Sequence, residues 1–202
     1  VSAPRDHSSF RGMRNAFYVT LLALSRYQHP LILIGIHMTI SLVEQAHNNI
    51  TNYLSEGDIA VDATMGNGFD TLFLAQQIGE AGTVYSFDLQ AAALHTTEQR
   101  LSKEKLLHRV CLIQDDHSQL SAYLTKDDVD SIRCAMFNLG YLPGSDKLLQ
   151  TTPNSTLQAL ESAIALLAQP GIISILAYTG HTGGREETES VKSWAKTLPK
   201  KQ

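Results

Sequence analysis

The sequence DIAVDATMGNGFDTLFL, residues 58–74, decides how the rest of the chain is interpreted. A short apolar run, 59–63, leads into a turn of small residues, and an apolar helical pattern begins at Phe69. A strand, a glycine turn and a helix in this order form the first unit of a nucleotide-binding α/β fold. Gly66 and Gly68 suit such a turn because glycine lacks a Cβ, accepts positive φ and lets the backbone approach a ligand closely.

Apolar segments alternate with helical patterns along the rest of the chain, which is typical of a mostly parallel, doubly wound sheet. The expected strands are 59–63, 83–88, 109–114, 131–139 and 172–178, and the expected helices are 41–54, 69–78, 90–105, 156–168 and 185–196. Ligands of such sheets bind beyond the carboxyl ends of the strands. Polar side chains occur at or near all of these ends, namely Asp62, Asp88, Asp115, Asn138 and Tyr178. The sequence therefore predicts an α/β domain with its ligand at this edge of the sheet.

The chain has 202 residues, 43% of them hydrophobic, which is sufficient for one domain with an apolar core. Its formal net charge of −4 differs from the strongly basic balance that is typical of nucleic-acid-binding domains. A local basic patch would still suffice to bind RNA, so the charge weakens that hypothesis without excluding it. Cys111 and Cys134 both lie in apolar runs, and we expect two buried free thiols in a reducing cytoplasm.

NAD and S-adenosylmethionine both suit a glycine turn that is followed by an acid at the end of the second strand. In either case Asp88 could accept hydrogen bonds from two ribose hydroxyls. The dinucleotide pattern G-x-G-x-x-G requires a third glycine, and this chain has Thr71 at that position. Asp62 and Asp70 add negative charge beside the turn, which would repel a pyrophosphate but tolerate a sulfonium and an ammonium group. The sequence therefore favours S-adenosylmethionine as the cofactor.

A second unusual stretch, Asn138-Leu139-Gly140-Tyr141, ends the fourth expected strand. It resembles the Asn/Asp-Pro-Pro-Tyr signature of amino-group methyltransferases, although Leu139 and Gly140 replace both prolines. In that signature the side-chain amide and a backbone carbonyl accept hydrogen bonds from the target nitrogen, and the aromatic ring packs on the substrate. The alternative interpretation is a strand end followed by an ordinary proline–glycine turn.

Three stretches together resemble the family described as putative rRNA methylases: DATMGNGFDTLFLA (62–75), FNLGYLPGSDK (137–147) and YTGHTGGREE (178–187). Characterised members of this family are tRNA methyltransferases. They methylate the amine of 5-aminomethyl-2-thiouridine at the anticodon wobble position, which gives 5-methylaminomethyl-2-thiouridine. The resemblance covers residues 42–194 and implies a class I, Rossmann-like methyltransferase fold. It implies tRNA as the partner through its anticodon region, is compatible with a homodimer and implies no membrane association.

The resemblance and the pattern of strand ends together predict the site residues. The residues expected to contact the cofactor are Asp62, Thr64, Gly66, Asn67, Gly68, Asp70, Thr71, Asp88, Gln90, Asp115, Asp116, His117 and Asn138. Of the expected catalytic residues, Asn138 would orient the amine, Tyr141 would stack on the uracil, and His181 would act as a base or contact a phosphate. Core packing of Tyr141 and purely local hydrogen bonds of His181 are the structural alternatives. The segment 115–117 could instead bind a metal, but this strand end normally meets the adenine, so no metal is expected.

The two ends of the chain depart from the family pattern. The family domain would begin near Met38, so we separate an N-terminal extension of unclear role, 1–38, from a methyltransferase domain, 39–202. The extension contains two apolar patches, 17–24 and 31–40, each shorter than the ~20 residues that cross a bilayer. An organellar targeting segment, an added helical element and an upstream start are all compatible with it. The family also continues beyond the last helix into an antiparallel strand pair, which we expect this chain to lack, leaving one sheet edge unpaired.

Three functions remain open at this point: the tRNA amine methyltransferase, a methyltransferase for rRNA or a small-molecule amine, and a truncated, non-catalytic fragment that binds the cofactor. The enzyme hypotheses imply in-line transfer of a methyl group from a sulfonium to an amine nitrogen. An alkylamine has a reference pKa of about 10.4, so its proton must be removed before attack. Burial, which lowers the pKa of an amine, or a general base would free the lone pair.

Overall fold

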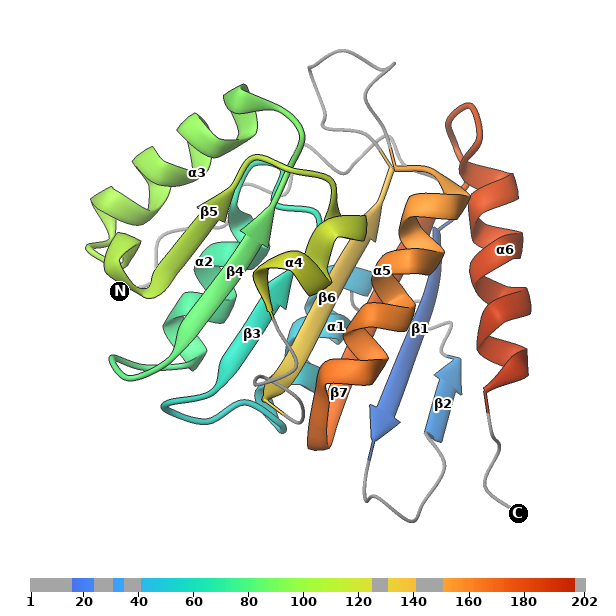
Figure 1. Cartoon of the computed structure of the whole chain (residues 1–202), viewed down its shortest axis with the longest axis horizontal. Coiled ribbons are helices and arrows are strands. Elements are labelled where there is room, and N and C mark those ends of the chain that lie inside the picture. Colours follow the sequence, from blue (N-terminus) through green and yellow to red (C-terminus); the bar gives the residue numbers. More distant parts are fainter. Residues whose placement is uncertain (1–15, 24–30, 35–40, 125–130, 141–150, 199–202) are drawn as a thin grey trace.

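The computed structural model describes residues 16–23, 31–34, 41–124, 131–140 and 151–198 (Figure 1). These residues form one seven-stranded sheet with helices on both faces. The strand order is β2-β1-β7-β6-β3-β4-β5. The Rossmann-like α/β fold that the sequence predicts is confirmed.

Five of the strands run parallel, as their alternation with helices requires. They are β3 (Ile59–Asp62), β4 (Thr83–Phe87), β5 (Val110–Ile113), β6 (Ile132–Leu139) and β7 (Leu167–Tyr178). β3 occupies the middle of this group, between β6 and β4. The carboxyl ends of these three strands therefore lie side by side, and the residues that follow them share one edge of the sheet.

Within the described residues, six α-helices cover the two faces of the sheet. They are α1 (Leu42–Thr51), α2 (Phe69–Gln77), α3 (Ala91–Lys103), α4 (Leu120–Tyr123), α5 (Pro153–Leu166) and α6 (Gly184–Thr197). Two 3₁₀ turns, η2 (Leu107–Arg109) and η3 (His117–Gln119), flank β5. Alternate residues of each strand face opposite layers. Thus Ala60 packs with buried residues of α1, α2 and α3, whereas the neighbouring Val61 packs with those of α4, α5 and α6.

The sheet edge beside β7 is covered by an N-terminal hairpin. β1 (Ala16–Ala23) pairs antiparallel with β7 over its whole length, from Ala16 opposite Tyr178 to Ala23 opposite Gly171, and β2 (Leu31–Ile34) pairs antiparallel with β1. The prediction of an unpaired edge is therefore wrong. The described part of the N-terminal extension contributes two antiparallel strands to this sheet.

Two local predictions also need correction. β7 begins at Leu167 rather than at Ile172, and the residues of the expected turn, 169–171, form an irregularity within it: Ile132 of β6 pairs with Leu167, but Cys134 pairs with Ile172. Cys134 is buried, but Cys111 is exposed because it lies on β5, the strand at the other edge of the sheet. Neither described cysteine takes part in a disulfide. Among the described helices, none combines the length and the apolar composition needed to span a lipid bilayer.

Candidate active site

The turn between β3 and α2 brings its backbone into close contact with α3. Gly66 and Gly68 have positive φ values of 52° and 74°, and Gly68 is the residue that caps α2. A Cβ at Gly68 would lie 2.5 Å from the Oγ1 atom of Thr97 in α3. From the same helix, Arg100 donates a hydrogen bond from Nε to the carbonyl of Asn67 at 2.8 Å. The turn is therefore held against α3 with no room for a side chain at residue 68.

Asp88 connects this turn to the end of β4. Its Oδ2 accepts a hydrogen bond from the Gly66 amide at 3.0 Å, and its Oδ1 accepts one from the Gln90 amide at 2.9 Å. Burial raises the pKa of Asp88, while these backbone donors act in the opposite direction. A carboxylate has about four acceptor positions, so Asp88 retains the capacity to accept two further hydrogen bonds.

Asp62 lies beneath the turn and has partners within the protein. It is 1% exposed, and its Oδ2 accepts a hydrogen bond from the hydroxyl of Thr71 at 2.6 Å. Its Oδ1 accepts one from the Thr64 amide at 3.1 Å. Thr71 also lies 2.8 Å from the Ser86 hydroxyl on β4. Thr71, found where the dinucleotide pattern has its third glycine, thus joins α2 to β3 and β4 by polar contacts.

The pKa of Asp62 is raised to about 7, first by burial and then by the nearby carboxylate of Asp70. The Asp62 carboxyl therefore holds its proton more tightly in the folded protein than in the unfolded chain. As the pH rises from about 4 to about 7, ionisation of Asp62 lowers the free energy of unfolding. Asp62→Asn, which cannot ionise, is expected to raise the free energy of unfolding at pH 8. The gain over the wild type should shrink as the pH falls towards 4. Urea unfolding of both proteins across this pH range checks the prediction, and a pH-independent difference would contradict it.

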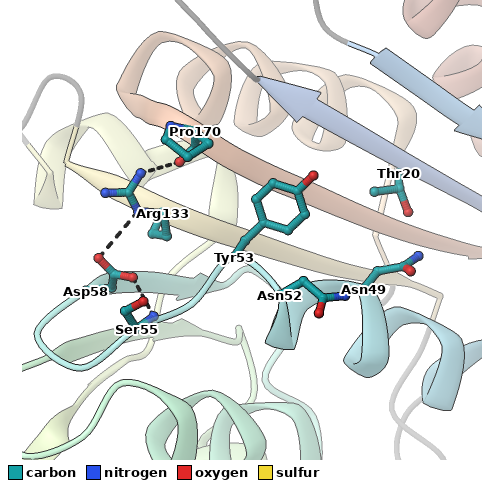
Figure 2. A pocket seen from close by; sticks show the side chains of 8 residues that line it. All are labelled: Thr20, Asn49, Asn52, Tyr53, Ser55, Asp58, Arg133 and Pro170. Carbon is teal, nitrogen blue, oxygen red and sulfur yellow. Dashed lines mark hydrogen bonds and ion pairs between the residues drawn. The ribbon is translucent and has the colours of Figure 1, made fainter.

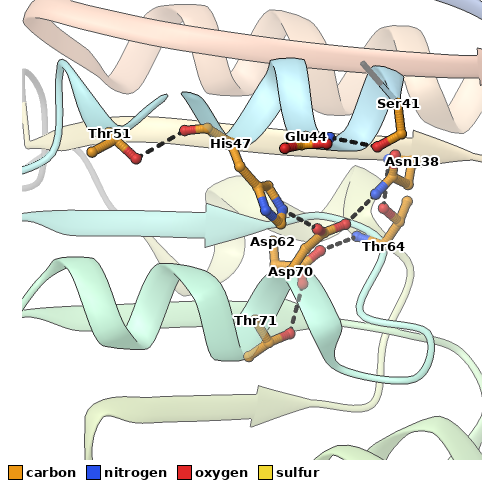
Figure 3. A network of polar contacts seen from close by, with 9 residues as sticks. All are labelled: Ser41, Glu44, His47, Thr51, Asp62, Thr64, Asp70, Thr71 and Asn138. Atoms are coloured by element: carbon orange, nitrogen blue, oxygen red, sulfur yellow. Dashed lines mark hydrogen bonds and ion pairs between the residues drawn. The ribbon is translucent and has the colours of Figure 1, made fainter. Parts of the chain in front are cut away.

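A hydrogen-bonded chain runs from α1 through α2 to β6 (Figure 3). His47 Nε2 lies 2.6 Å from Asp70 Oδ1, and the Asn138 side-chain amide donates to Asp70 Oδ2. The backbone amide of Asn138 donates to the hydroxyl of Thr64 at 2.7 Å. The Oδ1 atom of Asn138 is buried and has no hydrogen-bond partner among the residues that the structure describes.

His181 is brought to the same edge of the sheet as Asn138. A Cβ placed on Gly140, two residues beyond Asn138, would lie 3.5 Å from the Nε2 atom of His181. The other ring nitrogen, Nδ1, is 2.9 Å from the Thr182 carbonyl oxygen. Two of the three expected catalytic residues therefore lie around the end of β6. The third, Tyr141, lies outside the described residues.

The acid-rich segment after β5 is organised by local contacts. Asp115 accepts a hydrogen bond from the Tyr123 hydroxyl at 2.9 Å, and Asp116 accepts one from the Ser118 amide at 2.8 Å. His117 turns inward and is 3.0 Å from the Ala63 carbonyl through Nδ1, and burial lowers its pKa. Its buried Nε2 has no partner in the described part of the chain. Within that part, no three His, Cys, Asp or Glu side chains are grouped to hold a metal ion.

Three residues that contribute to this site are not among the predicted site residues. One is His47, whose position next to the buried Ala46 on α1 is the only signal in the sequence. The others are Thr151 and the buried Glu187, whose Oε2 accepts a hydrogen bond from the Thr151 hydroxyl at 2.7 Å. The Thr151 hydroxyl accepts one from the Gly140 amide at 3.0 Å. Glu187 therefore fixes the backbone just beyond Asn138, and no local pattern reveals this contact between distant segments.

A separate cavity of about 660 Å³ lies near the end of the sheet at which β3, β6 and β7 begin (Figure 2). It is lined by Thr20, Asn49, Asn52, Tyr53, Ser55, Asp58, Arg133 and Pro170. Arg133, near the start of β6, contacts the Pro170 carbonyl and pairs with Asp58 at 3.4 Å, so its charge is already partnered. Because ligands of doubly wound sheets bind beyond the carboxyl ends of the strands, we do not assign the cofactor to this cavity.

Comparisons with known proteins agree with this geometry. Residues 84–202 match the family described as putative rRNA methylase. A chloroplastic tRNA (mnm(5)s(2)U34)-methyltransferase of Arabidopsis thaliana is 38% identical over 166 residues, which are 77% of this chain and 59% of that protein. This chain therefore spans less than two thirds of that relative's length.

Two solved structures have the same fold and closely related sequences. A putative rRNA methylase from Clostridium thermocellum has 40% identity and a TM-score of 0.76, over 81% of this chain and 86% of that one. A putative methyltransferase from Streptococcus mutans, solved in complex with SAH, has 36% identity and a TM-score of 0.71, over 80% of this chain and 85% of that one.

Proposed function

Because the chain belongs to the rRNA methylase family of methyltransferases that depend on S-adenosylmethionine, we propose that it methylates the aminomethyl nitrogen of 5-aminomethyl-2-thiouridine at the tRNA wobble position. The relative that carries this activity in its name is 38% identical to the chain, which supports the choice of substrate. One structural observation carries the proposal. The Oδ1 atom of Asn138, at the carboxyl end of β6, is a buried acceptor that has no hydrogen-bond partner among the residues described. Such an oxygen suits an amine donor.

The described residues fit the cofactor. The turn leaves no space for a Cβ at Gly68, and Asp88 beside it has unused acceptor capacity. We propose that Asp88 holds the ribose hydroxyls and that segment 115–117 borders the adenine. When bound, S-adenosylmethionine supplies an electrophilic methyl group on a sulfonium.

The residues at the end of β6 and after β7 would prepare the amine. In its ammonium form the substrate has no lone pair, and a buried site lowers its pKa by disfavouring the charge. We assign to His181 the acceptance of the departing proton and to Asn138 Oδ1 a hydrogen bond from a remaining N–H. These contacts would leave the nitrogen lone pair free to form the new C–N bond as the C–S bond of the donor breaks. Positioning of the amine would account for most of the rate enhancement.

Methylation of purified tRNA tests the proposal directly. The full chain is incubated with labelled S-adenosylmethionine and with tRNA that either contains or lacks the aminomethyl precursor. Methyl transfer is expected only with the precursor, and digestion to nucleosides should yield 5-methylaminomethyl-2-thiouridine. Transfer that does not depend on the precursor would favour an rRNA or small-amine substrate. Cofactor binding without any transfer would indicate a non-catalytic fragment.

A reducing compartment such as the cytoplasm suits the two free thiols.

Asp88→Ala tests the cofactor assignment separately from catalysis. The variant loses the acceptor for the ribose hydroxyls and the hydrogen bonds from the Gly66 and Gln90 amides. We expect the dissociation constant for S-adenosylmethionine, measured by calorimetry, to rise about 10- to 100-fold, the equivalent of about one hydrogen bond to a charged group. The far-ultraviolet circular dichroism should be unchanged. An unaltered affinity would contradict the ribose role of Asp88.

A further inference from the structure

Asp70 was expected to contact the cofactor, but both of its carboxylate oxygens are engaged inside the protein (Figure 3). Oδ1 lies 2.6 Å from His47 Nε2, and Oδ2 accepts a hydrogen bond from the side-chain amide of Asn138. The side chains of His47 and Asp70 are 13% and 11% exposed. Asp70 is therefore placed between a helix α1 residue and the residue that we assign to the substrate amine.

The chemistry of Asp70 determines which way the Asn138 amide faces. The Oδ2 atom of Asp70 accepts a hydrogen bond, and the Asn138 amide turns its NH₂ group towards it. The carbonyl oxygen of the amide then points away from Asp70. This Oδ1 atom is the buried acceptor that has no partner among the described residues. Without a fixed acceptor at residue 70, the amide could rotate and present NH₂ to the substrate, where a second donor would oppose an amine N–H.

His47 keeps Asp70 in this orientation. Its ring stacks on Phe73 of α2, with 3.8 Å between ring centroids and an interplanar angle of 4°. Stacking fixes the plane of the imidazole, and Nε2 is then directed at Oδ1 of Asp70, one turn earlier in the same helix as Phe73. The His47 ring thus joins α1 to α2 through an apolar and a polar contact at once.

We propose that Asp70 and His47 are positioning residues, which hold the Asn138 amide with its carbonyl oxygen towards the methyl-accepting nitrogen. The inference rests on the proposed function for its substrate, but the orientation of the amide is a property of the free protein. It assigns Asp70 to substrate positioning rather than to the cofactor. It therefore predicts changes in kcat with little change in the affinity for S-adenosylmethionine.

Exchanging the two side chains provides the sharpest test. In Asp70→Asn, residue 70 can either donate or accept, so the Asn138 amide loses its fixed orientation, and kcat should fall about tenfold or more. In Asn138→Asp, two carboxylates would face each other, which should also lower kcat. In the double variant the new amide at position 70 can accept from His47 and donate to the new carboxylate at position 138, whose second oxygen again faces the amine. The double variant should recover most of the kcat lost in Asp70→Asn.

His47 is tested with a matched pair of substitutions. His47→Gln retains a side-chain donor for Asp70, whereas His47→Leu retains bulk but no donor. The leucine variant should lose about fivefold in kcat, comparable to one ordinary hydrogen bond, and the glutamine variant should lose less. Thermal unfolding and calorimetry with S-adenosylmethionine accompany each variant. A double exchange with no recovery, or a loss of cofactor affinity in Asp70→Asn as large as its loss of kcat, would overturn the inference.

A measurement that needs no substrate separates this inference from the proposed function. In ¹⁵N-labelled wild-type protein, the Asn138 side-chain NH₂ should give one strongly downfield proton because it bonds to a carboxylate. That shift should disappear in Asp70→Asn and persist in Asp88→Ala. If the wild type shows the shift but does not methylate the tRNA, the proposed function fails alone. If the shift is absent from the wild type, the positioning inference fails whatever the activity.

Discussion

Asn138→Ala is expected to lower kcat for amine methylation roughly 100- to 1,000-fold, the largest effect on activity among the variants considered. The substitution removes the acceptor oxygen at the end of β6, so the amine loses the contact that would orient its lone pair. It also leaves Asp70 Oδ2 without its donor, which should reduce the free energy of unfolding by about 1–3 kcal/mol. Steady-state kinetics with precursor-containing tRNA at saturating donor measures the effect.

The matched control for this variant is Asn52→Ala. Asn52 is exposed at the end of α1 and lines the cavity near the start of β6, at the opposite end of that strand from Asn138, so its substitution should leave kcat within about twofold of the wild type. The dissociation constant for S-adenosylmethionine should change far less than kcat in Asn138→Ala. If Asn138→Ala retains kcat within about threefold, another group orients the amine, and the assignment of Asn138 is wrong.

Gly68→Ala should have the largest effect on stability, lowering the free energy of unfolding by about 2–4 kcal/mol. Part of the loss is backbone strain, because residue 68 has a φ of 74°. The rest is steric, because the new Cβ would lie 2.5 Å from the Thr97 Oγ1 atom, and Thr97 is fully buried. Displacing the turn to relieve this contact would disturb the Gly66 amide that bonds Asp88. Affinity for S-adenosylmethionine should therefore fall as well.

Gly57→Ala separates the two contributions. Gly57 also has a positive φ, 90°, but a Cβ there would meet only the Cβ of Ala81 at 3.9 Å, an ordinary contact. This variant should lose about 1–2 kcal/mol through strain alone and bind the cofactor normally. Urea unfolding and calorimetry on both variants provide the comparison. Equal losses of stability, or normal cofactor affinity in Gly68→Ala, would show that the contact with Thr97 is easily relieved.

Most of the parallel part of the fold could be predicted from the sequence because its signals are local. The apolar run 59–63 lies directly before the glycine turn, and Asp88 directly follows the apolar run of β4. The hairpin of β1 and β2 could not be predicted in the same way. Its apolar patches are short, and what makes them strands is hydrogen bonding to β7, a partner that no local pattern identifies.

The sequence predicted where several polar side chains of the candidate site lie, but not which contacts they make. The strand-end rule correctly located Asp88 and Asn138 at one edge of the sheet. Asp62 was expected to face the ligand, but the structure gives it Thr71 and Thr64 as partners and almost no exposure. His47 was missed because a single histidine beside a buried helix stripe usually has only a packing role. In each case the decisive information is a contact between distant segments.

The pairing of β1 with β7 has a consequence for how the chain folds during synthesis. β1 is translated long before β7, and an isolated two-stranded hairpin is at best marginally stable in water. The hairpin therefore gains its lasting partner only after the rest of the parallel sheet has been made, and closing so long a loop is slow. Until then the exposed hairpin edge is a surface on which a ribosome-associated chaperone would have time to act.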